Sequence, residues 1–464
     1  MVQHPGISRE DVSQQKVALL VTTLSSLLTP MMASAVNIAM PAIARDFAMD
    51  AVSLSWVASS YLLAAAVFLL PFGRLADIVG RKRIFKIGTV IFSGASLLAG
   101  VAPATDIFLF ARLVQGIGAA MIFGTGIAIL TSVYPPHRRG WVLGVNVAAT
   151  YTGLSLGPFV GGMLTQYLGW RSVFLLNVPL GLLVLAAVWL KMPQEWADSR
   201  GEPFDWTGSL VYLLMLTAFM LGFTWLPRLA GVVLLLAAAG ALLLFMKWEA
   251  GHAHPIFQAG LIRGNTVFAF SNLAALVNYS ATFAITFLLS LYLQYIKGFT
   301  PRSAGLVLIA QPVVMAVFSP LAGRLSDRLE PRIVASAGMG LSAVGLFLFV
   351  WLQANSGLGF IVGALVLVGF GFALFSSPNT NAVMGSVEKK YYGVASATLG
   401  TMRMVGQMLS MAIATLVFSL FIGKVRITPA SYPLFLTGMR VSFVIFFVLC
   451  CCGVFFSLAR GRLR

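Results

Sequence analysis

The sequence predicts an all-α integral membrane protein with fourteen transmembrane helices, arranged as two six-helix halves with two helices inserted between them. The 464 residues are 59% hydrophobic and only 10% charged, whereas soluble globular proteins carry roughly 25% charged residues. The apolar residues form blocks of about twenty, the length at which a helix crosses a hydrocarbon core of about 30 Å. A short motif also recurs at corresponding places in the two halves, as expected of a membrane fold built from two related repeats.

The predicted spans follow one another with short polar connections. The longest polar stretch of the first half, 191–205, marks where that half ends. The chain therefore divides into a first half at 1–192, a linker with the two inserted helices at 193–265, and a second half at 266–464. In order, the spans are 17–43, 53–76, 84–103, 106–133, 140–167, 170–191, 208–226, 229–248, 266–297, 303–325, 333–353, 358–383, 393–422 and 434–459.

An even number of spans places both termini on the same side of the membrane. If that side is the cytoplasm, most lysines and arginines fall in inner segments, as the positive-inside rule requires. The basic residues within 81–86, 138–139, 389–390 and 460–464 are then all cytoplasmic. We therefore expect a multi-pass protein of the cytoplasmic (inner) membrane with both termini in the cytoplasm.

The composition also excludes several classes of function. The net charge of +17 lies in short loops without the aromatic and basic array of a nucleic-acid binder, so no nucleic-acid partner is expected. The adjacent cysteines at 450–452 form neither a disulfide framework nor a spaced metal site. There is no GxxxxGK[ST] loop and no cluster of acids and histidines typical of an enzyme. We expect no cofactor, no metal and no catalytic residue, and we predict that the chain is not an enzyme.

A repeated loop motif is the first candidate functional element. Residues 73–83 read GRLADIVGRKR and residues 323–332 read GRLSDRLEPR, each after the second helix of a half. Glycine permits a tight turn, while the charged residues cap a helix, pair with a cation or anchor at the membrane surface. A basic loop that only sets topology is the alternative. Because the repeat is in register, the sequence favours a cytoplasmic latch between the halves, formed by Gly73, Asp77, Gly80, Arg81, Gly323, Asp327 and Arg328.

The fourth helix carries a charge that must face protein or water. Residues 109–120 read LFARLVQGIGAA, and Arg112 lies well inside the span, where contact with lipid is costly. An arginine that snorkels to the outer interface is the alternative.

The fifth helix follows with small and kinking residues, GLSLGPFVGG at 153–162. Such a surface packs tightly or acts as a hinge. The predicted hinge residues are Gly153, Gly157, Pro158, Gly161 and Gly162.

These motifs resemble those of one family over essentially the whole chain. The loop at 73–83, the Arg112 segment and the glycine-rich segment are similar to the loop motif, the fourth-helix motif and the antiporter motif of major facilitator drug transporters. WRSVFLLNVPLG at 170–181 resembles a signature of the fourteen-helix branch, the drug:proton antiporter-2 (multidrug efflux) family. The resemblance implies the major facilitator fold, alternating access, and export of lipophilic molecules in exchange for protons.

The chain departs from the family pattern in its first helix. Members usually carry an aspartate shortly before a segment resembling VNVALP; here that segment is VNIAMP at 36–41, and Met32 holds the place of the aspartate. All fourteen acidic residues fall in tails, loops or helix ends, and the four histidines lie outside the spans. Either Asp46 or Asp106 at an outer end couples protons, or the substrate carries the proton, or transport is uncoupled.

Two arginines inside the spans, Arg112 and Arg403, require partners, because an intramembrane charge costs at least about 2.5 kcal/mol. Backbone carbonyls, tyrosines and water are sufficient partners, and a negatively charged substrate is a better one. We therefore predict a weakly basic cavity that favours anionic, zwitterionic or neutral amphiphiles over lipophilic cations. The predicted pathway residues are Arg112, Gln115, Asn37, Met32, Tyr61, Tyr151, Asn278, Arg403 and Gln407.

Two transport functions are consistent with the sequence. The leading one is export of lipophilic or amphiphilic small molecules, such as drugs and toxic metabolites, by a proton-coupled antiporter. The alternative is uptake or uncoupled transport of an anionic or aromatic metabolite, which the absence of the helix-1 acid favours. The expected partners are a small-molecule substrate, protons and membrane lipid, and the protein is expected to act as a monomer.

Overall fold

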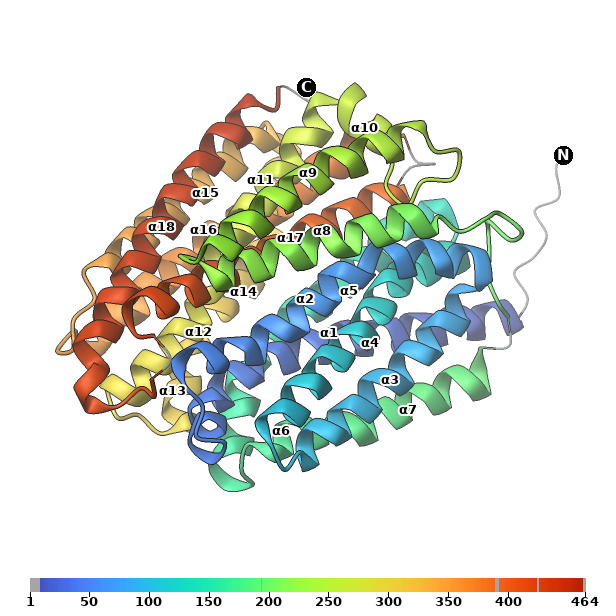
Figure 1. The fold of residues 1–464 in the computed structure, drawn as a ribbon. Helices are drawn as coiled ribbons and strands as arrows, with labels where there is room; N and C mark the ends of the chain where they lie inside the picture. The colour runs from blue at the N-terminus through green and yellow to red at the C-terminus, as the bar shows by residue number, and fades with distance from the viewer. Residues whose placement is uncertain (1–8, 193, 389–391, 424, 462–464) are drawn as a thin grey trace, which may run out of the picture.

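The computed structural model describes residues 9–192, 194–388, 392–423 and 425–461. Within these ranges the regular secondary structure is all helical, without strands, and the long helices run side by side in one bundle (Figure 1). Helix α1 begins and helix α18 ends at the same end of the bundle, which we call the terminal face. The opposite end, where α1 passes into α2, is the far face.

The first eight predicted spans correspond to helices with similar bounds, and one of these spans is divided in two. The elements are α1 (Arg9–Asp46), α2 (Ala51–Val79), α3 (Arg81–Val101), α4 (Thr105–Val133), α5 (Pro136–Tyr167), α6 (Arg171–Leu175), α7 (Asn177–Lys191), α8 (Trp206–Trp225) and α9 (Leu229–Gly251).

The last six predicted spans are also helical, preceded by the short α10 (Ala259–Gly264), which the sequence did not predict. The remaining elements are α11 (Thr266–Thr282), α12 (Ala284–Leu291), the π-helical turn η1 (Tyr292–Ile296), α13 (Pro301–Leu308), α14 (Ala310–Arg328), α15 (Pro331–Val350), α16 (Leu358–Gly385), α17 (Tyr392–Phe421), the 3₁₀ turn η3 (Pro429–Ser431) and α18 (Tyr432–Ala459).

Thirteen helical segments of the described chain are long and apolar enough to cross a membrane. The fourteenth predicted span is α5, which has 32 residues but is not among the thirteen. Its glycines, threonines, serines and internal proline make it less apolar than its neighbours. It nevertheless packs along α1 as a full-length member of the bundle. The all-α fold with fourteen membrane helices is therefore confirmed.

Three spans predicted as single helices are interrupted in the structure, at Leu176, Phe283 and Ile309. The second break has an identifiable cause. The backbone N–H of Ala284 donates to Ser410 Oγ of α17 at 3.0 Å. A side chain from another helix thus binds a backbone donor of the helix, which is a common cause of local breaks.

Helix packing separates two sets of helices and the inserted pair. Helices α1 to α7 pack mainly against one another, as do α11 to α18, and the main contacts between the two sets are α17 with α2 and α5 with α13 and α14. The inserted helices α8 and α9, green in Figure 1, form a hairpin in which α8 packs against α2 and α17. This packing supports our proposed division at 1–192, 193–265 and 266–464.

Candidate functional site

Hydrogen bonds between the two sets of helices are found in the middle of the bundle and toward the far face. Ser290 Oγ of α12 donates to the carbonyl of Asn37 in α1 at 2.6 Å. Gln294 Nε2 donates to the carbonyl of Ile38 at 3.0 Å. These bonds join the last turns of α1 to the segment that follows α11, on the far-face side of the bundle centre.

The loops of the far face are joined as well. The backbone N–H of Ala51 donates to the carbonyl of Val425 at 3.0 Å. The Nε of Arg426 donates to the carbonyl of Ala48 at 3.1 Å. The loop after α1 is therefore tied to the loop after α17, and these contacts close the bundle at the far face.

A cluster of polar and aromatic side chains surrounds Arg403 in the middle of the bundle. Arg403 Nη2 donates to Thr380 Oγ1 of α16 at 3.0 Å, and its guanidinium carbon lies 5.7 Å from the centre of the Tyr279 ring. The Nε of Arg403 is buried without a hydrogen-bond partner. No ion pair in the described part of the chain involves this arginine. The guanidinium thus keeps an unused donor.

Tyr151 of α5 brings the first set of helices to the same cluster. Its hydroxyl shares a hydrogen bond with Ser376 Oγ of α16. Its ring packs against Met315 and Phe372. The rings of Tyr279 and Phe372 meet edge to face, with 5.3 Å between their centres. Aromatic rings from both sets of helices therefore meet beside Arg403, and we call Tyr151, Tyr279, Phe372, Ser376, Thr380 and Arg403 the Arg403 cluster.

The chemistry of this cluster suits an anionic or zwitterionic molecule with an aromatic or apolar body. An arginine keeps its charge in proteins and donates in a planar fork that matches carboxylate and phosphate groups. Tyrosine and phenylalanine rings offer large apolar faces, and the tyrosine hydroxyls add polar contacts at their edges. The cluster has no carboxylate of its own to neutralise the guanidinium among the residues described above.

Arg112 lies apart from this cluster, inside the first set of helices, and only 3% of it is exposed. Its Nε donates to the carbonyl of Val57 in α2 at 2.9 Å, and its guanidinium lies 4.6 Å from the centre of the Tyr61 ring. A second N–H group of Arg112 donates to the amide oxygen of Gln115, whose Nε2 donates to Ser96 Oγ at 2.7 Å. The guanidinium of Arg112 is therefore bound by protein groups within the bundle. The side chain does not snorkel to the outer membrane interface.

The structure thus divides the predicted pathway residues. Tyr151 and Arg403 come together, and Gln407 lies one turn beyond Arg403 on α17, whereas Arg112, Gln115 and Tyr61 form a separate network. Met32, Asn37 and Asn278 are buried, and both polar side-chain atoms of Asn278 lack a partner. Sequence reasoning did not single out Phe372, Ser376 or Thr380. Their spacing of four residues along α16 is the signal that places them on one helix face.

The segment at 73–83, which the sequence predicts as a loop, contains the last turns of α2 and the start of α3, and only Gly80 lies between the two helices at the terminal face. The repeat residues Gly323, Asp327 and Arg328 likewise lie in α14. Arg81 pairs with Asp77 at 2.6 Å and with Asp198 at 2.8 Å, and it also donates to the hydroxyl of Ser132. Asp198 belongs to the linker between α7 and α8, so the predicted latch residues of this loop bind the linker. In the repeated motif, Arg328 is exposed, and the side chain of Asp327 lies outside the described residues.

The linker lies along this loop at several points. Glu195 Oε1 accepts from the backbone N–H of Lys82 at 2.7 Å, and the backbone N–H of Arg81 donates to the carbonyl of Trp196 at 2.9 Å. Farther along, Glu202 pairs with Arg74 of α2. The Arg74 guanidinium holds the pKa of this carboxyl below its ordinary value. The linker therefore binds the loop through both backbone and charged groups.

Gly80 provides a test of linker binding. Its φ of +128° is unfavourable for other residues, and a Cβ there would lie 2.6 Å from the carboxyl carbon of Glu195. We expect Gly80→Ala to weaken linker binding by about 1–2 kcal/mol, which corresponds to roughly tenfold faster proteolysis of residues 194–205. Gly73→Ala is the matched control, because a Cβ at Gly73 meets nothing within 4 Å. Equal cleavage rates for the two variants would contradict this account.

The small residues of α5 pack directly on α1. Cβ atoms built on Gly153, Gly157 and Gly161 would contact, respectively, the carbonyl of Leu27, the side chain of Ser34 and the Cα of Ala35. Gly162 instead faces Pro301, the first residue of α13, and α5 continues unbroken through Pro158. These contacts show that α5 packs tightly against α1 through its glycines. Hinge motion of α5 stays a prediction.

This packing predicts different effects for two glycines of the same helix. Gly153→Ala is expected to destabilise the protein by about 1–3 kcal/mol, because the new methyl group overlaps the backbone of α1. Gly144→Ala is expected to be neutral or stabilising by up to about 1 kcal/mol, because a Cβ there meets nothing within 4 Å and alanine favours helix. Thermal unfolding of both variants in the same detergent measures the difference. A Gly153→Ala variant as stable as Gly144→Ala would show that the contact is loose.

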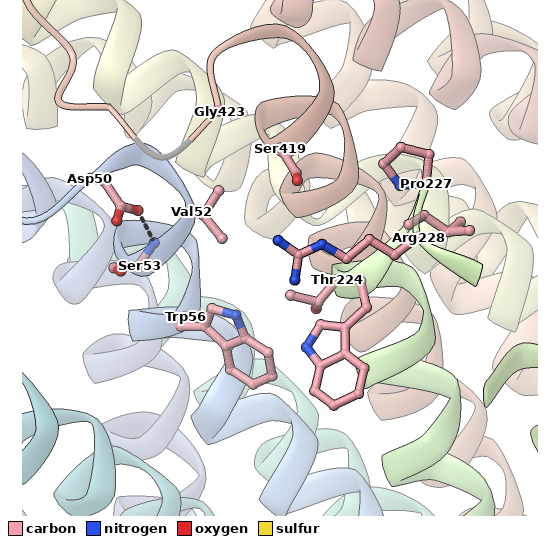
Figure 2. A pocket seen from close by; sticks show the side chains of 11 residues that line it. Asp50, Val52, Ser53, Trp56, Thr224, Pro227, Arg228, Ser419 and Gly423 are labelled. Atoms are coloured by element: carbon pink, nitrogen blue, oxygen red, sulfur yellow. Dashed lines mark hydrogen bonds between the residues drawn. The ribbon is translucent and has the colours of Figure 1, made fainter. Parts of the chain in front are cut away.

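A separate cavity of about 570 Å³ lies at the far face between α2, the α8–α9 turn and the end of α17. Figure 2 shows the guanidinium of Arg228 pointing into it between Ser419 and Trp56. Asp50, on its edge, accepts a hydrogen bond from the backbone N–H of Ser53 at 2.7 Å. Ser419 lies sixteen residues beyond Arg403 on α17, or about 24 Å along the helix. The cavity is therefore distinct from the Arg403 cluster.

Comparison with known proteins relates the whole chain to one family. Residues 22–262 and 272–462 match the profile of the Major Facilitator Superfamily. The riboflavin transporter RibZ of Clostridioides difficile is 28% identical over 421 residues, 89% of each chain. The multidrug resistance protein Stp of Mycobacterium tuberculosis is 31% identical over 405 residues, 86% of this chain and 75% of its own.

A solved structure has the same fold. It is a bacterial homolog of the human lysosomal transporter Spinster, in an inward-facing and unoccupied conformation. The TM-score is 0.66, with 98% of each chain covered and 17% sequence identity.

Proposed function

The chain belongs to the Major Facilitator Superfamily, and from this premise we propose that it is a secondary active transporter that exports amphiphilic small molecules by alternating access. The observation that carries the proposal is the Arg403 cluster. It joins both sets of helices in the middle of the bundle, where transporters of duplicated architecture bind their substrates. The similarity to Stp, a multidrug resistance protein, supports drugs as substrates.

The proposed substrate preference follows from the charge of the cluster. Arg403 has an unused donor and no carboxylate partner in the described chain. Anionic and zwitterionic amphiphiles neutralise this charge, whereas a lipophilic cation would add to it. We therefore favour amphiphiles with an acidic group over cations. Asn278, buried with an unpaired amide, is a further group of the proposed pathway.

We further propose that the protein lies in the inner membrane and that its terminal face is exposed to the cytoplasm. The basic residues at 81–86 lie at that face, in agreement with the positive-inside rule. Because hydrogen bonds close the far face, substrate would reach this state from the cytoplasmic side. The loop at 73–83 and its repeat act as the cytoplasmic latch, and the protein works as a monomer with protons as the coupling ion.

A second candidate function is supported by a specific relative. RibZ is a riboflavin transporter and aligns over 89% of this chain. Uptake or uncoupled passage of a planar aromatic metabolite would use the same rings of Tyr151, Tyr279 and Phe372.

Direction of transport separates the two candidates. We expect expression in a bacterial strain lacking its major efflux pumps to lower the accumulation of a fluorescent anionic amphiphile. Rescue of a riboflavin auxotroph at low external riboflavin, with unchanged dye accumulation, would instead favour the second candidate. Arg403→Ala serves as the weakened-binding control in the dye assay, and cells without the transporter are the control in the riboflavin assay.

A further inference from the structure

Two buried carboxyl groups lie at the terminal face, in the inserted helix pair. Asp205 is the residue before α8, and Glu249 lies in the last turn of α9. Each is only 3% exposed. The sequence places both at helix ends and predicts no role for them. Their burial is unusual, because isolated buried carboxylates are costly unless they are paired or protonated.

The two carboxyl groups converge on one point above Gly208. A Cβ built on Gly208 would contact Asp205 Oδ2 and would lie 2.5 Å from Glu249 Oε1. These two oxygens are therefore close neighbours. Glu249 Oε2 accepts from the backbone N–H of Phe257 at 2.8 Å, but Glu249 Oε1 is buried and has no hydrogen-bond partner. The unpartnered oxygen thus faces a second carboxyl oxygen.

The surroundings of Asp205 stabilise its ionised form. Its Oδ1 accepts from the backbone N–H of Gly208 at 2.8 Å, and its Oδ2 accepts from the indole N–H of Trp248 at 3.0 Å. It also caps the N-terminus of α8, where a negative charge is favoured. Glu249 has no comparable set of donors at its free oxygen. Two neighbouring carboxyls in a poorly solvated place do not both ionise, and the less stabilised one keeps its proton.

We propose that Asp205 and Glu249 form a proton-binding site. The proton resides on Glu249 and is donated in a hydrogen bond to Asp205 Oδ2, which satisfies the otherwise unpartnered oxygen. A metal ion is a poor fit, because it requires several oxygen ligands. The hydrogen-bond partners of Asp205, Gly208 N–H and the Trp248 indole N–H, are donors rather than further ligands.

The other titratable groups near the pair come from the linker, α2 and the segment after α9. His252 Nε2 lies 3.9 Å from Asp205 Oδ2. His254 Nδ1 lies 2.9 Å from Glu202, which also pairs with Arg74 of α2. No ion pair or hydrogen bond from a charged side chain of α10 or α17 to the pair occurs among the described residues. His252 is thus the basic group that faces the site.

The linker connects this site to the loop at 73–83. Glu202 precedes Asp205 by three residues and pairs with Arg74, and Asp198 pairs with Arg81. A change of charge at the first turn of α8 therefore acts on the segment that binds the proposed latch. This consequence rests on the proposed export function. It gives a coupling proton a binding place in a chain whose first helix has Met32 where the family pattern has an aspartate.

Infrared spectroscopy of the full chain in lipid nanodiscs tests the site without any transport. We expect the wild type at pH 7 to show the C=O stretch of a protonated carboxyl, which shifts in D₂O and disappears at alkaline pH. Glu249→Gln should lack this band. Asp106→Asn should keep it, because Asp106 is an exposed acid at the far face. A band of equal intensity in the wild type and in Glu249→Gln, or no band in the wild type, would overturn the proposal.

Asp205→Asn provides an independent test if Glu249→Gln does not fold. Removing the neighbouring negative charge favours ionisation of Glu249, so the band should disappear at a lower pH than in the wild type. An unchanged titration midpoint would argue against a shared proton. Transport assays separate the two proposals: absence of proton movement in wild-type liposomes would overturn the proposed antiport, while the infrared band decides on the proton site by itself.

Discussion

Replacing Arg403 with alanine is expected to lower the apparent affinity for anionic amphiphiles by roughly 10-fold to 100-fold. The estimate is the loss of one hydrogen-bonded contact to a charged group, about 1.5–3 kcal/mol. The guanidinium donates to Thr380 and lies beside Tyr279, with its Nε unused. Its removal leaves the cluster with aromatic rings and hydroxyls but no positive charge. Concentration-dependent uptake into inverted membrane vesicles measures the effect.

Two further variants make this result interpretable. Arg403→Lys keeps the charge but loses the planar fork, so an intermediate loss is expected. Arg440→Ala is the matched control, since this exposed arginine of α18 donates to the carbonyl of Leu352 near the far face. Neutral amphiphiles should be affected much less than anionic ones. An equal loss for anionic and neutral substrates would show that Arg403 holds helices together rather than binding substrate.

Arg112→Ala is expected to destabilise the protein by about 2–5 kcal/mol. The substitution leaves the carbonyl of Val57 and the amide of Gln115 without their donor inside the bundle, and each unsatisfied buried group costs about 1–3 kcal/mol. The ring of Tyr61 also loses the cation above it. Thermal unfolding of the wild type and the variant in the same detergent measures the loss of stability.

The control for this variant is Arg171→Ala. Arg171 pairs with Asp46 at the far face, with both side chains about two-fifths exposed, so its removal is expected to cost no more than about 1 kcal/mol. If Arg112→Ala is as stable as Arg171→Ala but loses substrate affinity, Arg112 belongs to the substrate pathway, as the sequence predicts. A destabilised variant with normal affinity per folded molecule would assign it to the packing of the first helix set.

Much of the fold was predictable because membrane helices are encoded locally. A span needs only an apolar block of sufficient length, and each of the fourteen predicted blocks corresponds to a helical segment. The interruption at Phe283 was not predictable, because its cause is Ser410, more than a hundred residues away. Helix α5 is not among the thirteen helices of the described chain with a sufficiently apolar stretch to cross a membrane, yet its small residues fit against α1.

The site was predicted only in part, because a sequence shows that a charge needs partners but not which ones it finds. In the sequence, Arg112 and Arg403 are equivalent, because each is a charge inside a predicted span that needs partners. The structure gives Arg112 a carbonyl and an amide of its own helix set, while Arg403 meets Tyr151 across the interface between the sets. Asp205 and Glu249 are 44 positions apart and show no pattern in the sequence, so only the α8–α9 hairpin brings them together.

The most direct test of export through the Arg403 cluster uses purified protein in liposomes containing a lumenal pH dye. External pH is stepped, and anionic amphiphiles and lipophilic cations are supplied in turn. We expect the anions to move protons across the membrane, with cations much less effective. At anion concentrations that half-saturate the wild type, we expect Arg403→Ala to lose most of the anion response while Arg440→Ala retains it. Proton movement with cations that persists in Arg403→Ala would contradict the account and would place substrate binding elsewhere in the bundle.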